Sequence, residues 1–202
     1  MVVDPGLRER KKQRTRRELA HAALRLFAEQ GYQATTVAQI AAAAEVSTKT
    51  FFSYFPSKPD VLFADPHERI DTAVGVLVDL APTQPPDVAL HRALGHLLST
   101  AQHADPDLGI LRQRLIATEP AVQARALAHI LSAQAQLAEA LHRAYPDRLD
   151  RLVTAAAVGS VVGALVATLY EGVRQDLPVE DLRRAASHAT QIALDGVSSA
   201  LP

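Results

Sequence analysis

Residues 36–55 read TVAQIAAAAEVSTKTFFSYF, a pattern that predicts two short helices around a tight turn. Thr36 and Gln39 have the spacing of a capping box, in which a hydroxyl and an amide satisfy the free N–H groups at a helix start. Residues 41–44 are all alanine, which favours a helix and leaves room for another helix to cross closely. The turn follows at Glu45, and Ser47 can cap the next helix. This is the pattern of a helix-turn-helix.

The second helix of this motif has one apolar face and one outward face. Phe51 and Phe55 are four residues apart, so they form one buried seam. The opposite face carries Thr48, Lys49 and Phe52. In helix-turn-helix proteins the first residues of the second helix contact base edges in the major groove, while flanking groups hold phosphates. We therefore expect Thr48 and Lys49 to contact bases.

A longer stretch resembles a known family. Residues 14–63, with the phrases RRELAHAALRLFAEQGYQATTVAQIA and VSTKTFFSYFPSKPDVLF, resemble the N-terminal DNA-binding domain of the tetracycline-repressor (TetR) family of bacterial transcription regulators. The resemblance implies an all-α fold, with a three-helix DNA-binding domain followed by a helical bundle for ligand binding and dimerisation. It also implies a ligand-responsive, sequence-specific regulator, most often a repressor that a small molecule releases from a palindromic operator.

The resemblance also assigns roles to single residues. Thr36 and Tyr54 are expected to hold phosphates, Thr48 and Lys49 to face bases, and Lys58 to bind the DNA backbone at the start of the fourth helix. Together with the capping residue and the exposed aromatic residue, the expected DNA-binding set is Thr36, Ser47, Thr48, Lys49, Phe52, Tyr54 and Lys58.

Two residues depart from the family pattern. Phe52 stands where the family often has tyrosine, so a phosphate hydrogen bond is replaced by apolar contact, for example with a thymine methyl group. Glu45 stands where the turn often has glycine, so the turn carries strain or the charge repels DNA.

The domain organisation follows from charge and capping signals. Residues 1–60 contain ten Lys or Arg and six Asp or Glu, whereas residues 61–202 contain eleven and sixteen, so only the first part suits a polyanion. Residues 1–14 predict a flexible basic arm, either a solvated tail or an arm that contacts DNA. Thr15 and Glu18 then form a capping box. The predicted domains are 15–60 for DNA binding and 61–202 for ligand binding and dimerisation.

The connection between these domains is the fourth helix. Ser57 and Asp60 predict its capping box, and with Lys58 its start could hold a phosphate. Pro66 interrupts the helix, so a kink and two consecutive helices both remain open. In the family this helix transmits ligand binding to the DNA-binding domain.

The C-terminal part predicts five helices, at residues 87–103, 107–117, 120–145, 149–174 and 178–201. The last two carry ridges of small residues, which suit tight packing either within the chain or against a second copy. The resemblance favours a homodimer through these two helices. The ridges are Ala155, Gly159, Gly163 and Ala167 on one helix and Ala185, Ala189 and Ala193 on the other.

Residues 152–170 are free of charge over a length just sufficient for a membrane span. Small and hydroxyl residues make up more than half of them, so we expect a buried helix of a soluble, cytoplasmic protein and no membrane partner.

Other chemistries find little support in the sequence. The chain has no cysteine, which excludes disulfides and thiolate metal sites, and none of its eight histidines forms an i, i+4 pair with another histidine. No catalytic motif is present, so we expect no enzymatic activity, no metal and no cofactor. The rival hypothesis is a helical ligand-binding or scaffold protein that has lost DNA binding. The effector site is not identified, and its polar or aromatic candidates are Arg112, Arg114, His129, Tyr145 and Tyr170.

Overall fold

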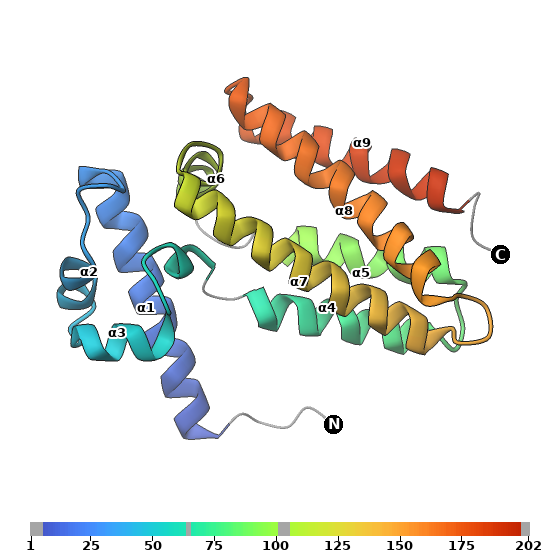
Figure 1. Cartoon of the computed structure of the whole chain (residues 1–202), viewed down its shortest axis with the longest axis horizontal. Helices are drawn as coiled ribbons and strands as arrows, with labels where there is room; N and C mark the ends of the chain where they lie inside the picture. The colour runs from blue at the N-terminus through green and yellow to red at the C-terminus, as the bar shows by residue number, and fades with distance from the viewer. Residues whose placement is uncertain (1–5, 64–65, 101–105, 199–202) are drawn as a thin grey trace.

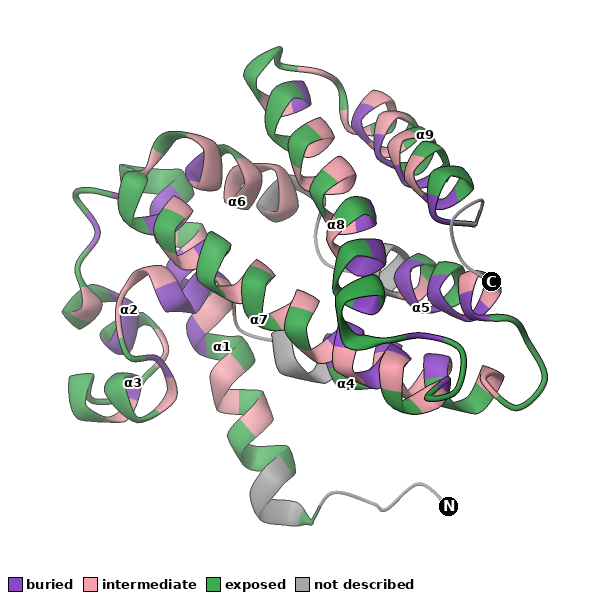
Figure 2. Cartoon of the chain, turned by 45° about the vertical axis from the view of Figure 1, so that its right-hand side comes forward, coloured by how far each residue is buried: buried purple, intermediate pink, exposed green. Residues whose placement is uncertain are grey.

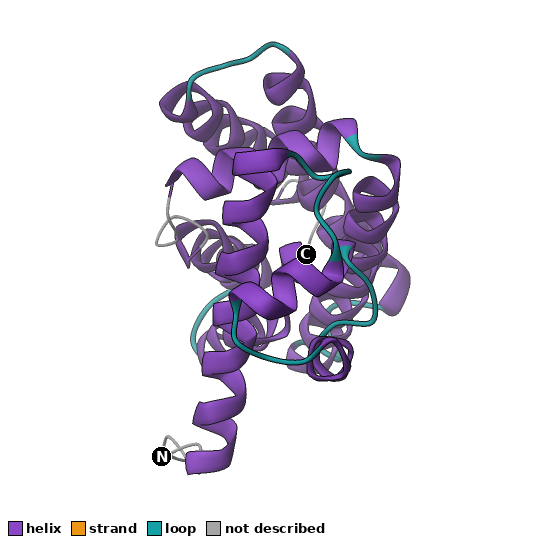
Figure 3. Cartoon of the chain, turned by 90° about the vertical axis from the view of Figure 1, so that its left-hand side faces the viewer, coloured by secondary structure: helices purple, strands orange, loops and turns teal. Residues whose placement is uncertain are grey.

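The computed structural model describes residues 6–63, 66–100 and 106–198, and within these ranges every regular element is helical (Figure 3). The all-α fold predicted from the sequence is confirmed. The first elements form a unit that we call the head, made of α1 (Leu7–Gln30), α2 (Val37–Ala43), α3 (Thr48–Tyr54) and the 3₁₀ helix η1 (Pro59–Phe63). The remaining helices form the body: α4 (Pro66–Leu80), α5 (Pro86–Thr100), α6 (Pro106–Thr118), α7 (Pro120–Ala144), α8 (Arg151–Arg174) and α9 (Val179–Ser198).

The head lies at one end of the molecule and the body extends away from it (Figure 1). In the body α4 packs against α5 and α7, α7 packs against α8, and α8 packs against α9. α6 lies at the junction, where it contacts both α1 and α7. All five helices predicted for the body occur, and their bounds agree within two residues at each end that lies in the described ranges.

The head core follows from the helical periodicity of the sequence. Leu19, Ala23 and Phe27 lie four residues apart on α1, and all three are buried. They pack with Phe51 on α3 and with Phe55 directly after it, which are both completely buried and whose ring centroids lie 5.6 Å apart. The same cluster includes residues of the body, and its other buried members are Tyr32, Ile40, Ala41, Val61, Leu62, Leu115 and Val122.

The body core is built from leucines and alanines on the facing sides of its helices (Figure 2). Ala73 on α4 and Ala89 and Ala93 on α5 are completely buried, and their small side chains allow these two helices to approach closely. Leu141 on α7 and Val158 on α8 continue the core toward the other face of the bundle.

The predicted flexible arm and the helix start at Thr15 are wrong for residues 7–14, which belong to α1. The Arg10 N–H donates to the Gly6 carbonyl at 3.2 Å, so the helix begins directly after Gly6. Lys, Arg, Gln and Glu are good helix formers, and Arg14 pairs with Glu18 at 2.8 Å across one turn. Residues 1–5 lie outside the described residues.

Pro66 separates two elements, because η1 ends at Phe63 and α4 begins at Pro66, with residues 64–65 outside the described ranges. The capping box predicted for Ser57 and Asp60 is wrong. The Asp60 N–H donates to the Ser57 carbonyl, and the Ser57 hydroxyl donates to the Asp60 carboxylate at 2.6 Å. Pro59 favours the tight start of a 3₁₀ turn, and the carboxylate is held by the body, as described below.

Within the described residues, α8 is long and apolar enough to cross a membrane by length and composition. Only 28% of its most apolar segment is buried in the single chain, so the expectation of a buried helix does not hold for one subunit. The small residues Ala155, Gly163 and Ala167 are exposed on this helix. An apolar face of α8 therefore remains uncovered by the chain itself.

Candidate nucleic-acid interface

α3 begins where the sequence predicts and presents one face outward. The Ser47 hydroxyl accepts a hydrogen bond from the Thr50 N–H at 3.0 Å, which fixes the first turn of the helix. Because the Phe51 ring is completely buried, the residues on the other side of α3 must face away from the core. Ser47, Thr48 and Lys49 are all exposed. The first turn of α3 can therefore reach a groove without moving the head core.

Phe52 extends this exposed face with an apolar ring. Its side chain is 55% exposed, although its ring lies edge-on to Phe51 with centroids 5.4 Å apart. An aromatic side chain that the core leaves uncovered gains by burial against a partner. A thymine methyl group is the apolar feature that the major groove offers.

The capping box predicted at the start of α2 is confirmed. The Thr36 hydroxyl accepts from the Gln39 N–H at 3.2 Å, and the Thr36 N–H donates to the Gln39 side-chain oxygen at 2.8 Å. Gln30 also donates to that oxygen at 3.3 Å, which ties the end of α1 to the start of α2. Thr36 itself is exposed, so the box positions it on the surface of the head.

The turn between α2 and α3 places a glutamate in a left-handed conformation. Glu45 has a φ of 56°, its N–H donates to the Ala42 carbonyl, and the Val46 N–H donates to the Ala41 carbonyl. This pair of bonds is a Schellman motif, in which the left-handed position usually holds glycine. The strain predicted for Glu45 therefore has a structural basis.

α1 contacts the end of α3 through a side chain that the sequence did not indicate, and this contact holds α3 in place. The Arg16 guanidinium lies 4.7 Å from the centroid of the Phe55 ring and donates to the Tyr54 carbonyl at 3.2 Å. The backbone at the end of α3 is therefore attached to α1, and the half-buried Tyr54 side chain lies beside this attachment.

Lys58 points into the head. Its ammonium group donates to the carbonyls of Tyr32 and Thr35 at 2.8 and 3.0 Å, and it lies 4.1 Å from the centroid of the Tyr32 ring. Burial lowers the pKa of the Lys58 ammonium group, while the negative charge of Glu119 acts in the opposite direction. Two of its three N–H groups thus hold the connection between α1 and α2.

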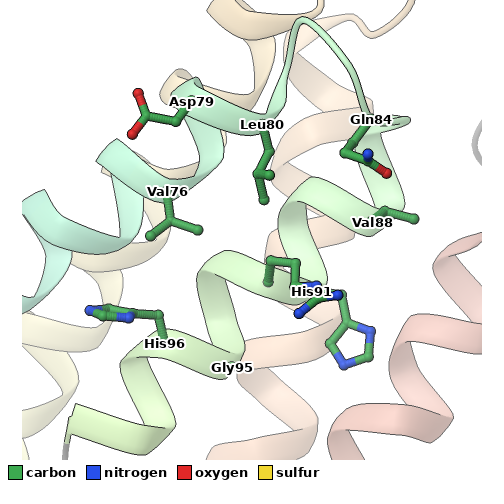
Figure 4. Close-up of a pocket in the computed structure, with 9 residues that line it drawn as sticks. Val76, Asp79, Leu80, Gln84, Val88, His91, Gly95 and His96 are labelled. Atoms are coloured by element: carbon green, nitrogen blue, oxygen red, sulfur yellow. The ribbon is translucent and has the colours of Figure 1, made fainter.

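The body has a half-open groove of about 970 Å³ between α4 and α5. Val76 and Leu80 extend from α4 toward α5, where Val88 lines the same groove (Figure 4). His91 and His96 lie at its rim and point to different sides. The groove thus combines an apolar floor with polar edges, as small-molecule sites do.

The candidates for the effector site predicted from the sequence lie elsewhere. The Tyr145 hydroxyl donates to the Gln84 carbonyl at 2.8 Å, and Arg114 pairs with Asp176 at 3.3 Å on the surface. His129 lies between the head and the body. The residues that line the groove do not include any of the five candidates, Arg112, Arg114, His129, Tyr145 and Tyr170.

Comparison with known proteins agrees with this architecture. The family model described as "Bacterial regulatory proteins, tetR family" matches residues 19–64, which hold most of the head. The HTH-type transcriptional regulator TcmR of Streptomyces glaucescens is 34% identical over 202 residues, a match that covers 96% of this chain and 87% of TcmR. The chain belongs to the TetR family. This TetR-family protein is accordingly a transcription regulator with a helix-turn-helix head.

Other relatives of this TetR-family regulator support the same fold. The HTH-type transcriptional regulator HbdR of Aromatoleum sp. (strain CIB) is 43% identical over 72 residues, which cover 36% of this chain and 30% of HbdR. The structure of Thermus thermophilus FadR in complex with lauroyl-CoA superposes with a TM-score of 0.59 at 24% identity, covering 90% of this chain and 94% of FadR. SmeT of Stenotrophomonas maltophilia has a TM-score of 0.59 at 19% identity, and the match covers 90% of this chain and 89% of SmeT.

Proposed function

We propose that this TetR-family regulator is a homodimeric repressor that places α3 of each head in the major groove of a palindromic operator and is released by a small molecule. The observation that carries the proposal is the exposed first turn of α3 on a head whose core is otherwise closed. Two heads would then meet half-sites separated by one helical turn of DNA or a multiple, about 34–36 Å each.

The exposed face of α3 supports the division of contacts. Thr48 and Lys49 would hydrogen-bond to base edges, and Phe52 would pack against a thymine methyl group. Ser47 lies at the start of the helix beside the DNA backbone in this arrangement. Thr36 and Tyr54 would hold phosphates from the two sides, and Lys58 would offer its third N–H to the backbone.

The dimer would form through α8 and α9. Leu152 on α8 is 83% exposed and Ile192 on α9 is 60% exposed, and the small-residue ridge of α8 is also uncovered. An exposed apolar face of this kind marks an interaction surface, and small residues let helices approach closely. A second copy of the chain would cover this face, so the apolar character of α8 needs no membrane to explain it. Light scattering in detergent-free buffer should therefore give about twice the 21.7 kDa chain mass, and a detergent requirement would contradict this assignment.

The effector would act by population shift, because a ligand that prefers heads at the wrong separation must weaken DNA binding by the same differential affinity. FadR of Thermus thermophilus is bound to lauroyl-CoA, and SmeT has been solved with triclosan. We place the effector in the groove between α4 and α5, and we propose no enzymatic activity for a cytoplasmic protein whose relatives are regulators. Lauroyl-CoA and triclosan are the first probes to titrate against a DNA complex.

The decisive test uses duplexes selected from a random pool by the wild-type protein. Lys49→Ala should change which bases are preferred, because Lys49 faces the groove. Lys58→Ala should weaken all duplexes alike, because it removes a contact with the DNA backbone and also the two hydrogen bonds that hold the connection between α1 and α2. Arg143→Gln on the distant end of α7 is the matched control and should change neither property. If the wild-type protein binds selected and unrelated duplexes equally, and Lys49→Ala has no effect, the proposed interface is wrong.

A further inference from the structure

The carboxylate of Asp60 lies at the joint between the head and the body. Its side chain is 6% exposed, although aspartate is rarely buried without partners. The Ser57 hydroxyl donates to one carboxylate oxygen at 2.6 Å, and the Arg125 guanidinium of α7 pairs with the other. The His129 Nε2 atom, also on α7, lies 3.8 Å from that second oxygen. One charged group of the head is thus paired with an arginine of the body and lies beside a histidine of the same helix.

The surrounding contacts form a single stripe along the first half of α7. Glu119, Val122, Ala126 and His129 follow each other at helical spacing, so they share one face. Glu119 accepts a hydrogen bond from Gln33 of the head, and Val122 is part of the head core. Ala126 is buried, and the His129 ring lies 4.9 Å from a phenylalanine ring of η1. The head therefore docks on α7 along three turns.

Apolar contact along this stripe provides burial without strict direction, because the hydrophobic effect is not directional. An ion pair with charge-assisted hydrogen bonds has a defined geometry. Asp60 lies at the last described element of the head, directly before the chain continues into the body. A contact at that point constrains rotation of the whole head about its connection.

We propose that Asp60 is a positioning residue, whose pair with Arg125 fixes the orientation of the head on α7 and thereby the separation of the two α3 helices on DNA. The inference rests on the proposed dimeric DNA-binding function. It assigns part of the choice of half-site spacing to a buried charge that does not contact DNA.

The orientation can be measured without DNA. The chain contains no cysteine, so Ala42→Cys on α2 and Ala135→Cys on α7, both at exposed positions, provide one spin label on the head and one on the body. Double electron–electron resonance, with labelled protein diluted into unlabelled protein, then reports the head-to-body distance. We expect one narrow distribution for the parent protein and a broad or shifted one for Asp60→Asn and Arg125→Gln.

Arg143→Gln is the matched control, because it removes an exposed ion pair with Glu139 on the same helix. Its distance distribution should equal that of the parent. Equal distributions for folded Asp60→Asn and parent protein would overturn the proposal. If Asp60→Asn does not fold, Arg125→Gln decides, since Arg125 is 40% exposed and is not one of the residues of the head core.

The consequence for DNA is measured with selected duplexes in which base pairs are added or removed between the half-sites. For the parent we expect one preferred spacing. In Asp60→Asn and Arg125→Gln the ratio of dissociation constants between the next-best and the best spacing should fall by about tenfold, the effect of losing one charge-assisted hydrogen bond. An unchanged ratio alongside a broadened distance distribution would overturn the link to spacing. If the parent binds no palindromic duplex, the proposed function fails, while the distance measurement still decides whether Asp60 orients the head.

Discussion

Replacing Glu45 with glycine should stabilise the head, which is the opposite of what removing a side chain usually does. Glu45 has a φ of 56° at the left-handed position of the Schellman motif that ends α2. For an L-residue with a Cβ atom, this backbone conformation is about 1–2 kcal/mol less favourable than the right-handed one, whereas for glycine the two are almost equal in free energy. Part of this gain is lost because glycine increases the entropy of the unfolded chain.

We expect a net gain of about 1 kcal/mol in the free energy of unfolding for Glu45→Gly. For a chain of this length that gain raises the melting temperature by roughly 2–4 °C. Far-UV circular dichroism during heating measures the shift. Glu45→Gln is the matched control, because it removes the charge and keeps the Cβ atom, so its melting temperature should stay near that of the wild type.

The same two variants separate strain from charge in DNA binding. Both remove a negative charge from the turn before α3, so both should strengthen binding to unrelated duplexes at low salt, where such contacts are least screened. A gain in melting temperature for Glu45→Gln as large as that for Glu45→Gly would refute the backbone argument. So would a glycine variant no more stable than the wild type.

Further substitutions test the backbone conformation at a second position and the packing of the helices. Asp176→Gly, at a second left-handed position (φ of 51°) after α8, should also raise the melting temperature, but by less, because it breaks the exposed pair with Arg114. Phe51→Ala removes a completely buried ring and should lower the free energy of unfolding, measured with urea, by about 3–5 kcal/mol. The same variant should lose duplex binding in a gel shift. Gly172→Ala would place a Cβ atom 2.5 Å from the Cδ2 atom of Leu182, so that side chain must shift, while the higher helix propensity of alanine offsets part of the cost. We expect a net loss of at most about 1 kcal/mol in the free energy of unfolding, and a smaller loss when Gly172→Ala is made in a Leu182→Ala background.

The parts of the structure that the sequence predicted depend on neighbours along the chain. The capping box of Thr36 and Gln39 and the cap at Ser47 are formed by residues three apart. Phe51 and Phe55 meet because they are one helical turn apart. Such signals are complete within a few residues, so the helix-turn-helix and its exposed face could be located without a structure.

The parts that were missed depend on contacts between residues far apart in the sequence. The sequence did not indicate that Lys58 reaches back to carbonyls of the connection between α1 and α2, in addition to its proposed contact with the DNA backbone. Arg16 appears in the sequence as one of a run of basic residues, and only the fold brings it over Phe55. The basic run was also expected to be a flexible arm, although high helix propensity makes residues 7–14 part of α1. The positive charge of a lysine or arginine in the sequence does not show whether its side chain faces solvent or donates to a backbone carbonyl.

The same limit applies to the boundary between domains that the sequence predicts at residue 60. In the structure Asp60 pairs with Arg125 of the body, and Leu115 and Val122 of the body complete the core of the head. A cut at this boundary would leave a buried carboxylate without its cation and an apolar surface open to water, and both changes are unfavourable. The head thus carries the DNA-binding residues, but its hydrophobic core also includes residues of α6 and α7. A shift of these two helices would therefore reach α3 through α1 and η1, which they contact, and through the shared head core, in addition to any signal carried by α4.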